Sequence, residues 1–430
     1  MTEKPTYRIA IVGLGYVGLP LAIALAPRFS VIGFDSSRQR IAELRQGRDR
    51  TREIDEGVLR ASALELTEKP DAMRGADVFI ITVPTPVAED NTPDLDAVRA
   101  ACRTIGGVIA KGTIVVLEST VYPGVTEEIC GGEIAAASGL VAGKDFHLGY
   151  SPERINPGDR KHTVDRIVKV VAGDTPAVTA KLAEIYGAIN NGQIFVAKNI
   201  RTAEAAKVIE NAQRDINIAF INEVTMIFNR VGLSVYDVLA ASSTKWNFLP
   251  FGPGFVGGHC IGVDPFYLAH LSQSLGHNPE VILAGRRIND GMSAYVAQQI
   301  AANLAKHGGK TSGARLLVLG LTFKENIPDL RNSKVADLVT ALRAAGHTVE
   351  VHDAHADAGE AKELYGIDLH RKLEALDGFD GVIGAVAHDE YRVLRMADFA
   401  RLVKPAGLVA DIKGIWRDVE LPARMLRWEL

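Results

Sequence analysis

A single cysteine in a glycine-rich loop is the residue of this chain that is best placed to do chemistry. Cys260 lies in the segment FGPGFVGGHCIGVDPF, which spans residues 251–266 and contains five glycines. Glycines let the backbone adopt positive φ and approach a ligand closely, and they provide few side chains for a core. Four residues later, Asp264 supplies a carboxylate that could fold back toward the sulfur. Burial of the thiol in a core is the alternative interpretation.

Residues 13–18, GLGYVG, form a dinucleotide-binding fingerprint in its full context. The motif follows the apolar run RIAIV, opens a helical pattern, and is answered by Asp35 at the end of the next apolar run. Gly13 makes the turn, Gly15 lets backbone amides approach a pyrophosphate, and Gly18 permits close helix packing. The segment therefore predicts a phosphate site at a helix N-terminus, with a tight turn that binds nothing as the alternative.

Asp35 favours NAD over NADP as the ligand of this fingerprint. A carboxylate at that position accepts hydrogen bonds from the adenosine ribose and repels a 2′-phosphate. Arg38 and Arg40 lie close enough in the sequence to reach a phosphate. Binding of NADP therefore stays open at this point.

Two further segments stand directly after predicted strands. VPTP at residues 83–86 follows the apolar run 77–83, and STVYPG at residues 119–124 follows the run 113–117. Ligands of open α/β sheets bind at the carboxyl ends of the strands, so both segments are candidates for the nicotinamide side of a cofactor site. Thr120 would offer a hydroxyl to the reacting centre. A plain turn is the alternative for each segment.

Lys207 and Asn211 form a polar pair on a predicted helix. They are four residues apart and so share one helix face. A lysine and an amide together can stabilise an oxyanion or orient a water molecule. An exposed polar stripe is the alternative interpretation of the same spacing.

An NAD site and a reactive thiol together predict a particular reaction. A thiolate that attacks an aldehyde gives a thiohemiacetal, which can lose a second hydride to become a thioester and then be hydrolysed to an acid. These steps amount to a four-electron oxidation of an alcohol. Free cysteine has a pKa of about 8.5, so the surroundings of Cys260 should supply positive potential or a helix end.

Strand and helix patterns alternate along the regions that would position these residues. Apolar runs that precede helical patterns lie at residues 8–12, 31–34, 77–83 and 113–117. The same order returns, without the glycine fingerprint, in runs at residues 315–319, 349–352, 381–386 and 408–411. The fold class predicted is therefore α/β, with two Rossmann-like doubly wound domains of which the second binds something other than a dinucleotide.

Helical patterns dominate the region between the two predicted sheets. Residues 202–231 contain no Gly or Pro and repeat apolar residues at spacings of three and four, which predicts one long helix. A second helical stretch is predicted at roughly residues 265–299. The long central helix and a helical middle domain would join the two sheets.

Composition and charge exclude several classes of protein. Hydrophobic residues make up 47% of the 430 residues, charged residues make up 23%, and the net charge is −4, which gives no reason to expect a nucleic-acid partner. No apolar stretch is long enough for a membrane span, and no signal peptide is evident. The only cysteines, Cys102, Cys130 and Cys260, form no CxxC pair. We therefore expect a cytoplasmic protein without a metal site or a membrane partner.

Seven segments, in this order along the chain, resemble the UDP-glucose/GDP-mannose dehydrogenase family. They are GLGYVGLP, VPTP, ESTVYPG, SPERINPGD, AAKVIENAQRDINIAFINE, GPGFVGGHCIGVDP and GLTFKENIPDLRNS. The resemblance implies NAD-dependent oxidation of C6 of a nucleotide-linked sugar to a uronate, in a homodimer formed through the central helix. The domains expected are an NAD-binding domain at 1–200, a central helical dimerisation domain carrying the cysteine loop at 201–305, and a UDP-sugar-binding domain at 306–430.

The resemblance also implies roles for individual residues. Cys260 matches the nucleophile, with Lys207 and Asn211 as the oxyanion and water-orienting pair. The full set of catalytic candidates is Cys260, Lys207, Asn211, Asp264, Thr120 and Glu153. The candidates for binding NAD, which include the fingerprint, are Gly13, Gly15, Tyr16, Val17, Gly18, Asp35, Arg40, Thr85, Thr120 and Arg331. The candidates for binding the substrate are Glu153, Arg154, Lys207, Asn211, Phe251, Gly252, Gly254, Gly257 and Lys324.

Two departures from the UDP-glucose enzymes of the family indicate a different substrate branch. Those enzymes carry a second glutamate where this chain has Pro157, and a lysine where it has Val263. The segments SPERINPGD and GGHCIGVDP instead resemble the branch that oxidises UDP-N-acetylhexosamines. His259 could help to charge the sulfur site or could simply pack. Two further residues, Arg286 and Arg287, could reach a substrate phosphate across a dimer or could form surface ion pairs.

The function predicted is four-electron, NAD-dependent oxidation of UDP-GlcNAc or UDP-GalNAc to the uronate, through a thioester on Cys260, for surface polysaccharide. UDP-ManNAc or UDP-glucose as substrate is the alternative within the family. A two-electron hydroxyacid-type dehydrogenase and a catalytically silent NAD-binding regulator are the alternatives from other classes.

Overall fold

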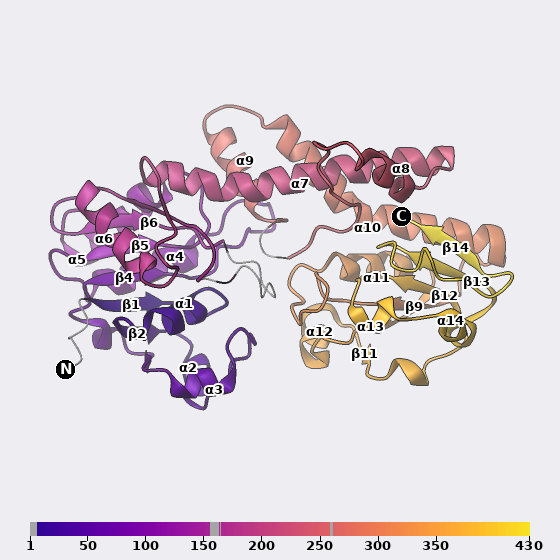
Figure 1. The fold of residues 1–430 in the computed structure, drawn as a ribbon, viewed down its shortest axis with the longest axis horizontal. Coiled ribbons are helices and arrows are strands. Elements are labelled where there is room, and N and C mark those ends of the chain that lie inside the picture. Colours follow the sequence, from indigo (N-terminus) through magenta and orange to yellow (C-terminus); the bar gives the residue numbers. More distant parts are fainter. Residues whose placement is uncertain (1–6, 155–162, 164, 259–260) are drawn as a thin grey trace. The chain divides into compact units, whose positions relative to one another are not determined.

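The computed structural model describes residues 7–154, 163, 165–258 and 261–430. The predictions for Pro157, His259 and Cys260 therefore fall outside the described residues. The chain divides into two compact units (Figure 1). The first unit comprises Met1–Glu210 and Phe266–His277, and the second comprises Asn211–Pro265 and Asn278–Leu430.

An eight-stranded sheet forms the centre of the first unit. Its strand order is β3-β2-β1-β4-β5-β6-β7-β8, and all neighbouring strands are parallel except β6 and β7. The strands are β1 (Arg8–Val12), β2 (Ser30–Phe34), β3 (Glu65–Thr67), β4 (Val78–Ile81), β5 (Ile114–Leu117), β6 (His147–Tyr150), β7 (Lys169–Gly173) and β8 (Ile194–Val196). The order runs outward from β1 in both directions, as is typical of a doubly wound sheet.

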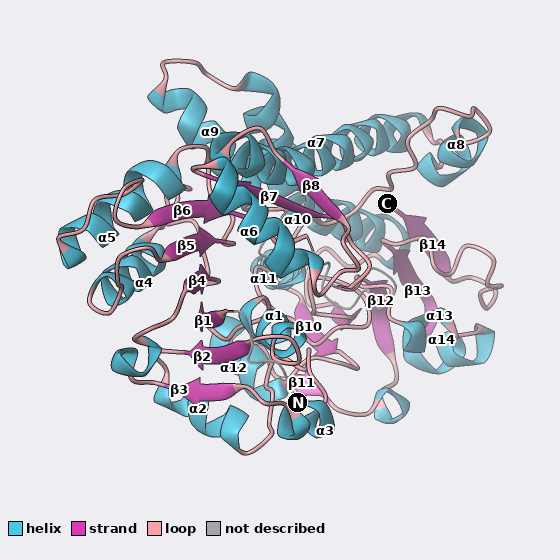
Figure 2. Cartoon of the chain, turned by 60° about the vertical axis from the view of Figure 1, so that its left-hand side comes forward, coloured by secondary structure: helices cyan, strands magenta, loops and turns pink. Residues whose placement is uncertain are grey.

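Helices cover both faces of this sheet. All residues of β4 and β5 are buried, as expected for strands that lie between two helical layers. One face packs against α1 (Gly18–Leu25) and α6 (Pro176–Gly187), and Figure 2 shows α4 (Asp96–Gly106) and α5 (Gly131–Ser138) on the other. The remaining helical segments are α2 (Arg38–Arg45), α3 (Glu56–Ala61), η1 (Pro70–Met73) and the π-helical turn η2 (Val125–Cys130).

A six-stranded, fully parallel sheet forms the centre of the second unit, in the order β11-β10-β9-β12-β13-β14. The strands are β9 (Arg315–Leu319), β10 (Thr348–His352), β11 (Leu369–His370), β12 (Phe379–Gly384), β13 (Val403–Asp411) and β14 (Leu426–Glu429). The helical segments around it are α11 (Lys334–Ala344), α12 (Ala358–Tyr365), η3 (Leu373–Ala375), α13 (Asp389–Arg392) and α14 (Met396–Leu402). Leu316 and Val318 join one apolar core while Leu317 and Leu319 join another, so both faces of β9 are covered.

The turn after the first strand is the same in both sheets. Gly13 and Gly320 have φ values of 98° and 95°, a region that favours glycine. Each donates its backbone N–H over 2.8 Å to the last carbonyl of the next strand, that of Phe34 or of His352. The prediction of two Rossmann-like domains is confirmed.

The helical segments outside the two sheets agree only in part with the sequence pattern. The long helix α7 (Ile200–Val231) is confirmed, and α8 (Val235–Ser242) follows it. The helical stretch predicted at roughly 265–299 is divided in the structure into α9 (Asp264–Ser274) and α10 (Glu280–Gly308). Gly276 has a φ of 78°, and Pro279, directly before α10, has no N–H to continue a helix, so the chain turns between them.

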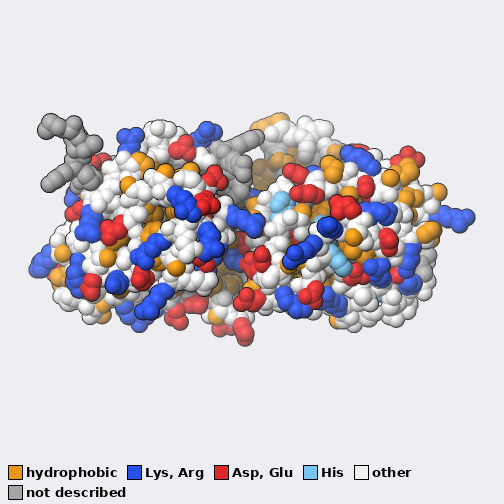
Figure 3. Space-filling model, turned by 90° about the horizontal axis from the view of Figure 1, so that it is seen from below, with side chains coloured by type: hydrophobic (Ala, Val, Ile, Leu, Met, Phe, Trp, Pro, Cys, Tyr) orange, Lys and Arg blue, Asp and Glu red, His pale blue; other side chains and the backbone are white. Residues whose placement is uncertain are grey.

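Charge is mixed on one face of the molecule, and the described helices lack the character of membrane spans. Acidic and basic side chains are interspersed over the face shown in Figure 3. Within the described ranges, no helix combines the length and the apolar character needed to cross a bilayer. Nor do His, Cys, Asp or Glu side chains there gather in a group of three that could hold a metal ion.

Candidate active site

The glycine turn of the first unit has the shape that a dinucleotide needs. A Cβ atom on Gly18 would lie 1.9 Å from the carbonyl oxygen of Gly13, so only glycine fits where α1 begins. At Gly15, by contrast, nothing lies within 4 Å of the position that a Cβ would take. Tyr16 and Val17 complete the turn before the helix. Open space at Gly15 and a helix N-terminus beside it fit the approach of a pyrophosphate.

Asp35 and Arg40 hold this turn from the β2 side. The Asp35 carboxylate accepts the backbone N–H of Leu14 at 3.0 Å, and its side chain remains partly exposed. Arg40 is buried, donates from Nε to the Leu14 carbonyl at 2.9 Å, and pairs with Asp49 at 2.8 Å. The Nη1 atom of Arg40 is buried without a hydrogen-bond partner. The partly exposed Asp35 fits the predicted ribose contact, and Arg40 has a clear structural task in addition to its predicted cofactor contact.

The two segments after β4 and β5 lie together at the carboxyl edge of the first sheet. The Ser119 hydroxyl donates to the Val83 carbonyl at 2.6 Å and so joins one segment to the other. Thr85 and Thr120, the predicted cofactor and catalytic residues of these segments, are both partly exposed. From α9, the Tyr267 hydroxyl donates to the Pro86 carbonyl at 3.2 Å.

A buried ion-pair network holds Glu153. The Lys169 ammonium on β7 lies 3.2 Å from a Glu153 carboxylate oxygen and 2.7 Å from one of Glu118. The Tyr186 hydroxyl on α6 donates to the other oxygen of Glu118 at 2.5 Å. Burial disfavours the ammonium, but the two carboxylates outweigh it and raise the pKa of Lys169. Burial also raises the pKa of Glu118. The network therefore fixes one carboxylate oxygen of Glu153 beside a buried cation.

Lys169, Glu118 and Tyr186 were not predicted from the sequence as site residues. The available signal was a lysine inside the apolar strand KVVAG and a glutamate directly after the apolar strand IVVL. A charged residue in a strand that is buried on both faces must find a partner there. Next to this network, the predicted substrate residue Arg154 pairs with Glu210 on α7 at 2.7 Å.

Glu204 ties α7 to the segment that carries Thr120. Its buried carboxylate accepts the backbone N–H groups of Gly124 at 2.7 Å and Thr126 at 2.9 Å, and also the Thr126 hydroxyl at 2.6 Å. Burial raises the pKa of Glu204 to about 6. Lys207, a predicted catalytic residue, is buried three residues further along the same helix. Glu204 was not predicted from the sequence as a site residue.

In the second unit, the structure brings together two predicted catalytic residues. The Asn211 side-chain amide on α7 donates to the Asp264 carboxylate at 2.5 Å, and both side chains are buried. Asn211 lies four residues after Lys207 on α7, as the pattern predicted. Asp264 is the first residue of α9, at the end of the glycine-rich loop.

The predicted substrate loop is fastened to α7 by a side-chain amide. Asn222 donates to the Gly254 carbonyl at 3.0 Å and accepts the Gly254 N–H at 2.8 Å. A Cβ on Gly257 would lie 2.6 Å from the Asn332 carbonyl, so the loop needs glycine there. Phe251 is partly exposed and Gly252 is exposed.

A lysine-lined cavity lies beside this loop in the second unit. Its lining includes Phe255, Gly257, Phe323, Lys324, Lys334 and Lys413. Lys413 follows β13, and burial lowers the pKa of its ammonium. Lysines around a small cavity offer charge to a phosphate group. Lys324 was predicted as a substrate residue, whereas Lys413 was missed because only the fold brings it to the loop.

The other arginines singled out from the sequence differ in their surroundings. Arg331, a predicted NAD contact, pairs with Asp329 at 2.6 Å. Arg286 is buried and pairs with Asp215 at 2.7 Å, so a surface ion pair, one of the two alternatives for that residue, is wrong. Gly285, directly before this arginine, lies close to α7, since a Cβ there would be 3.5 Å from the Ile216 side chain. Arg287 is exposed.

Comparison with known proteins gives matches along nearly the whole chain. The sequence matches the UDP-glucose/GDP-mannose dehydrogenase family in its NAD binding domain at residues 7–190, its central domain at residues 201–291, and its UDP binding domain at residues 317–418. Protein CapL of Staphylococcus aureus is 50% identical over 98% of this chain and 99% of its own length.

An enzyme and a solved structure extend this similarity. The UDP-N-acetyl-D-glucosamine 6-dehydrogenase of Pseudomonas aeruginosa is 49% identical over 94% of this chain and 96% of its own. The solved structure of a UDP-D-ManNAc dehydrogenase from Pyrococcus horikoshii is 30% identical, covers 98% of both chains and gives a TM-score of 0.88.

Proposed function

Because the chain belongs to the UDP-glucose/GDP-mannose dehydrogenase family, we propose that it oxidises C6 of UDP-N-acetylglucosamine to the uronate, with NAD as the oxidant. The observation that carries this proposal is full-length similarity to two enzymes named UDP-N-acetyl-D-glucosamine 6-dehydrogenase, at 49% and 45% identity. A UDP-N-acetyl-D-mannosamine dehydrogenase is only 33% identical. UDP-GalNAc is the next candidate substrate, and the product serves surface polysaccharide.

NAD binds the first sheet, and the residues around the glycine turn fit it. Gly15 leaves room for the pyrophosphate, Gly13 and Gly18 allow the tight turn and the start of α1, and Asp35 presents a carboxylate to the adenosine ribose. When bound, the cofactor accepts hydride from the carbon that is being oxidised. Three further residues, Thr85, Thr120 and Arg331, contact NAD in this proposal. They lie in segments of the sequence that resemble the family's NAD-binding segments.

The protein side chains handle protons and the covalent intermediate. Glu153, held by Lys169, assists removal of the alcohol proton while the carbon loses its first hydride. The Cys260 thiolate then adds to the aldehyde carbon, and loss of the second hydride leaves a thioester. Lys207 and Asn211 stabilise the oxyanion, and Asp264 orients Asn211 through their hydrogen bond. Water, held by Thr120 and Glu153, hydrolyses the thioester and restores the thiol.

The lysine-lined cavity of the second unit receives the nucleotide part of the substrate. Lys324 and Lys413 neutralise the diphosphate, and backbone amides of the loop around Gly254 and Gly257 donate hydrogen bonds to it. Arg154 contacts the sugar part of the substrate, as do Phe251 and Gly252. Burial lowers the pKa of Lys413, so an arriving phosphate stabilises its charged form.

The chain acts as a homodimer formed through α7. That helix exposes Phe220, Ile227 and Val231, whose spacings of seven and four put them on one face. Exposed apolar rows of this kind mark interaction surfaces. The three domains of the chain span residues 1–200, 201–305 and 306–430, and the protein acts in the cytoplasm.

The stoichiometry of NADH tests the reaction. Purified protein supplied with UDP-GlcNAc, UDP-GalNAc, UDP-ManNAc and UDP-glucose in parallel should release two NADH per uronate formed, fastest with UDP-GlcNAc. The Cys260→Ala variant should form no uronate, because no thioester can form. One NADH per sugar would instead indicate a two-electron dehydrogenase, and uronate from the alanine variant would refute the thioester.

A further inference from the structure

The second sheet contains a counterpart of the predicted cofactor site. The last residues of β1, β2 and β4 are register partners, and so are the last residues of β9, β10 and β12. Counted from these strand ends, Asp35 corresponds to Asp353 and Thr85 corresponds to His388. The first-half residues of these pairs are partly exposed, whereas Asp353 is 7% and His388 is 0% exposed. Thr85 is therefore accessible in the first sheet, whereas its counterpart in the second sheet, His388, is fully buried.

The carboxylate of Asp353 is bonded to other groups of the protein. One oxygen accepts the backbone N–H groups of Leu321 at 2.5 Å and Thr322 at 3.0 Å, and it also lies 3.1 Å from Nε2 of His388. Burial alone would raise the pKa of Asp353, but His388 and the two amides outweigh it and hold the pKa well below its usual range. The acidic residue that faces a ribose in the first half is here an anchor for the turn after β9.

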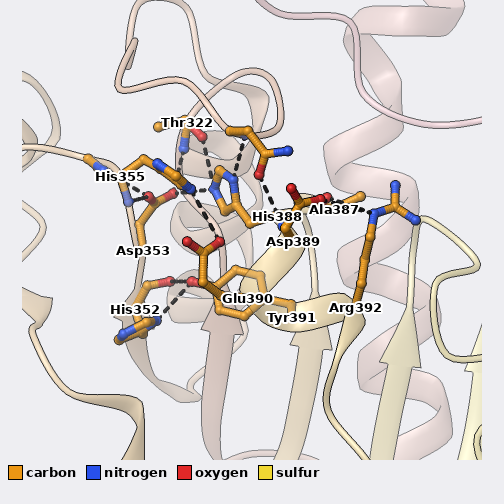
Figure 4. Close-up of polar contacts among 12 residues, drawn as sticks. Thr322, His352, Asp353, His355, Ala387, His388, Asp389, Glu390, Tyr391 and Arg392 are labelled. Carbon is orange, nitrogen blue, oxygen red and sulfur yellow. Dashed lines mark hydrogen bonds and ion pairs between the residues drawn. The ribbon is translucent and has the colours of Figure 1, made fainter.

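Both ring nitrogens of His388 are engaged (Figure 4). Nε2 lies 3.1 Å from the Asp353 carboxylate and 3.1 Å from the Thr322 hydroxyl. Nδ1 accepts the backbone N–H of Asn326 at 2.9 Å. An acceptor nitrogen carries no proton, so Nε2 is the ring nitrogen that donates to Asp353.

These contacts fasten the two ends of a short segment, residues 321–326. Thr322, at one end, donates its hydroxyl to the Lys324 carbonyl at 3.0 Å. Asn326, at the other end, accepts the Asp389 N–H at 3.0 Å and has a φ of 59°. Lys324 lies between the anchors and lines the lysine-lined cavity. The backbone conformation of the segment that carries Lys324 therefore depends on His388.

We infer that His388 is a positioning residue for nucleotide-sugar binding, which holds the segment 321–326 so that Lys324 lines the cavity. The inference rests on the proposed function, because it takes Lys324 as a ligand of the substrate. His388 stands at the position that corresponds to Thr85, a predicted cofactor contact of the first sheet. In the second sheet this buried imidazole instead supports the lysine-lined cavity.

Replacement of His388 should separate substrate binding from the other steps. We expect His388→Ala to raise the KM for UDP-GlcNAc and the Kd for UDP at least about tenfold, as expected for the loss of one buried hydrogen-bonding group. The KM for NAD should stay the same within error. His388→Asn offers an acceptor near the Nδ1 position and His388→Gln a donor near the Nε2 position, so each should recover part of the loss. Steady-state kinetics and calorimetry with UDP provide the readouts.

The matched control is another buried histidine of the same sheet. His347 accepts the Ala314 N–H at 3.3 Å at the opposite, amino-terminal edge of β9, and His347→Asn should leave both affinities unchanged. Equal losses of UDP and NAD affinity in His388→Ala, or no loss of either, would overturn the inference. If that variant does not fold, Thr322→Val carries the test with the same expected results.

UDP binding, measured by calorimetry, and NADH stoichiometry test the role of His388 and the proposed oxidation separately. Wild-type protein that binds UDP but releases one NADH per sugar would refute the proposed oxidation and leave the His388 result to stand. Wild-type protein that does not bind UDP would overturn the inference itself.

Discussion

At the scale of single residues, the cation of the Glu153 network gives a sharp prediction. Lys169 is 3% exposed and neutralises two buried carboxylates, so Lys169→Met leaves both without a cation. Breaking a buried ion pair on one side typically costs about 3–5 kcal/mol. We expect the free energy of unfolding of Lys169→Met to fall by about that amount, and kcat to fall as well, because Glu153 loses its fixed position.

A double variant separates charge from packing at the same position. Glu118→Gln combined with Lys169→Met removes one charge of each sign and should recover most of the lost stability, measured by denaturant unfolding. Activity should stay low, because Glu153 still lacks its partner. A single variant as stable as the wild type would show that the ion pairs do not hold Glu153 in solution.

At the scale of elements, Glu204 links α7 to the turn after β5 and should give stability a pH dependence. Its pKa in the folded protein is about 6, above the ordinary value of 4.5. The folded state therefore binds this proton more tightly, so the contribution is fully present below pH 4.5 and is lost as the pH rises through 6. The shift corresponds to about 2 kcal/mol.

The variant Glu204→Gln lacks this titration, so its stability relative to the wild type should rise by about 2 kcal/mol between pH 4.5 and pH 7. Other carboxylates titrate in both proteins and cancel in the difference. Glu127→Gln, which removes an exposed carboxylate that pairs with Arg201, is the control and should give a much smaller change. A difference that stays flat, or that falls with pH, would contradict the assignment. Denaturant unfolding at both pH values measures it.

Elements with a local signal could be predicted from the sequence. Short apolar runs marked the strands, and the absence of Gly and Pro marked α7. The break between α9 and α10 was missed because the surrounding residues keep a helical pattern, although Gly276 and Pro279 supply the turn. Local spacing likewise gave the glycine fingerprint and the pair of Lys207 and Asn211.

Contacts between distant parts of the sequence could not be predicted. Lys169 meets Glu118 across 51 residues, and His388 meets Asp353 across 35. The partner of a buried charge is set by which strands become neighbours, and no local pattern encodes that choice. Such pairs are recognisable in the sequence only as charged or polar residues inside or directly after apolar runs, which need a partner that the fold must supply.

At the scale of the whole molecule, the apolar row on α7 predicts how copies of the chain associate. Phe220, Ile227 and Val231 are 59%, 51% and 65% exposed, and all three lie in the second unit. A monomer would leave this row in water, whereas an isologous dimer would bury it against the same row of a second copy. The row is therefore expected to form the centre of a homodimer interface.

Charge placed in this row should separate the proposed dimer. Loss of a central apolar anchor typically costs at least about 2 kcal/mol of binding, so Phe220→Asp should raise the dimer dissociation constant at least about thirtyfold. Val393→Asp, at a position that is 63% exposed beside α13, is the matched control and should not change it. Sedimentation over a range of protein concentrations measures both. A dimer that survives Phe220→Asp and Ile227→Asp together would place the interface elsewhere, because two buried, unpaired carboxylates on each side could not be accommodated.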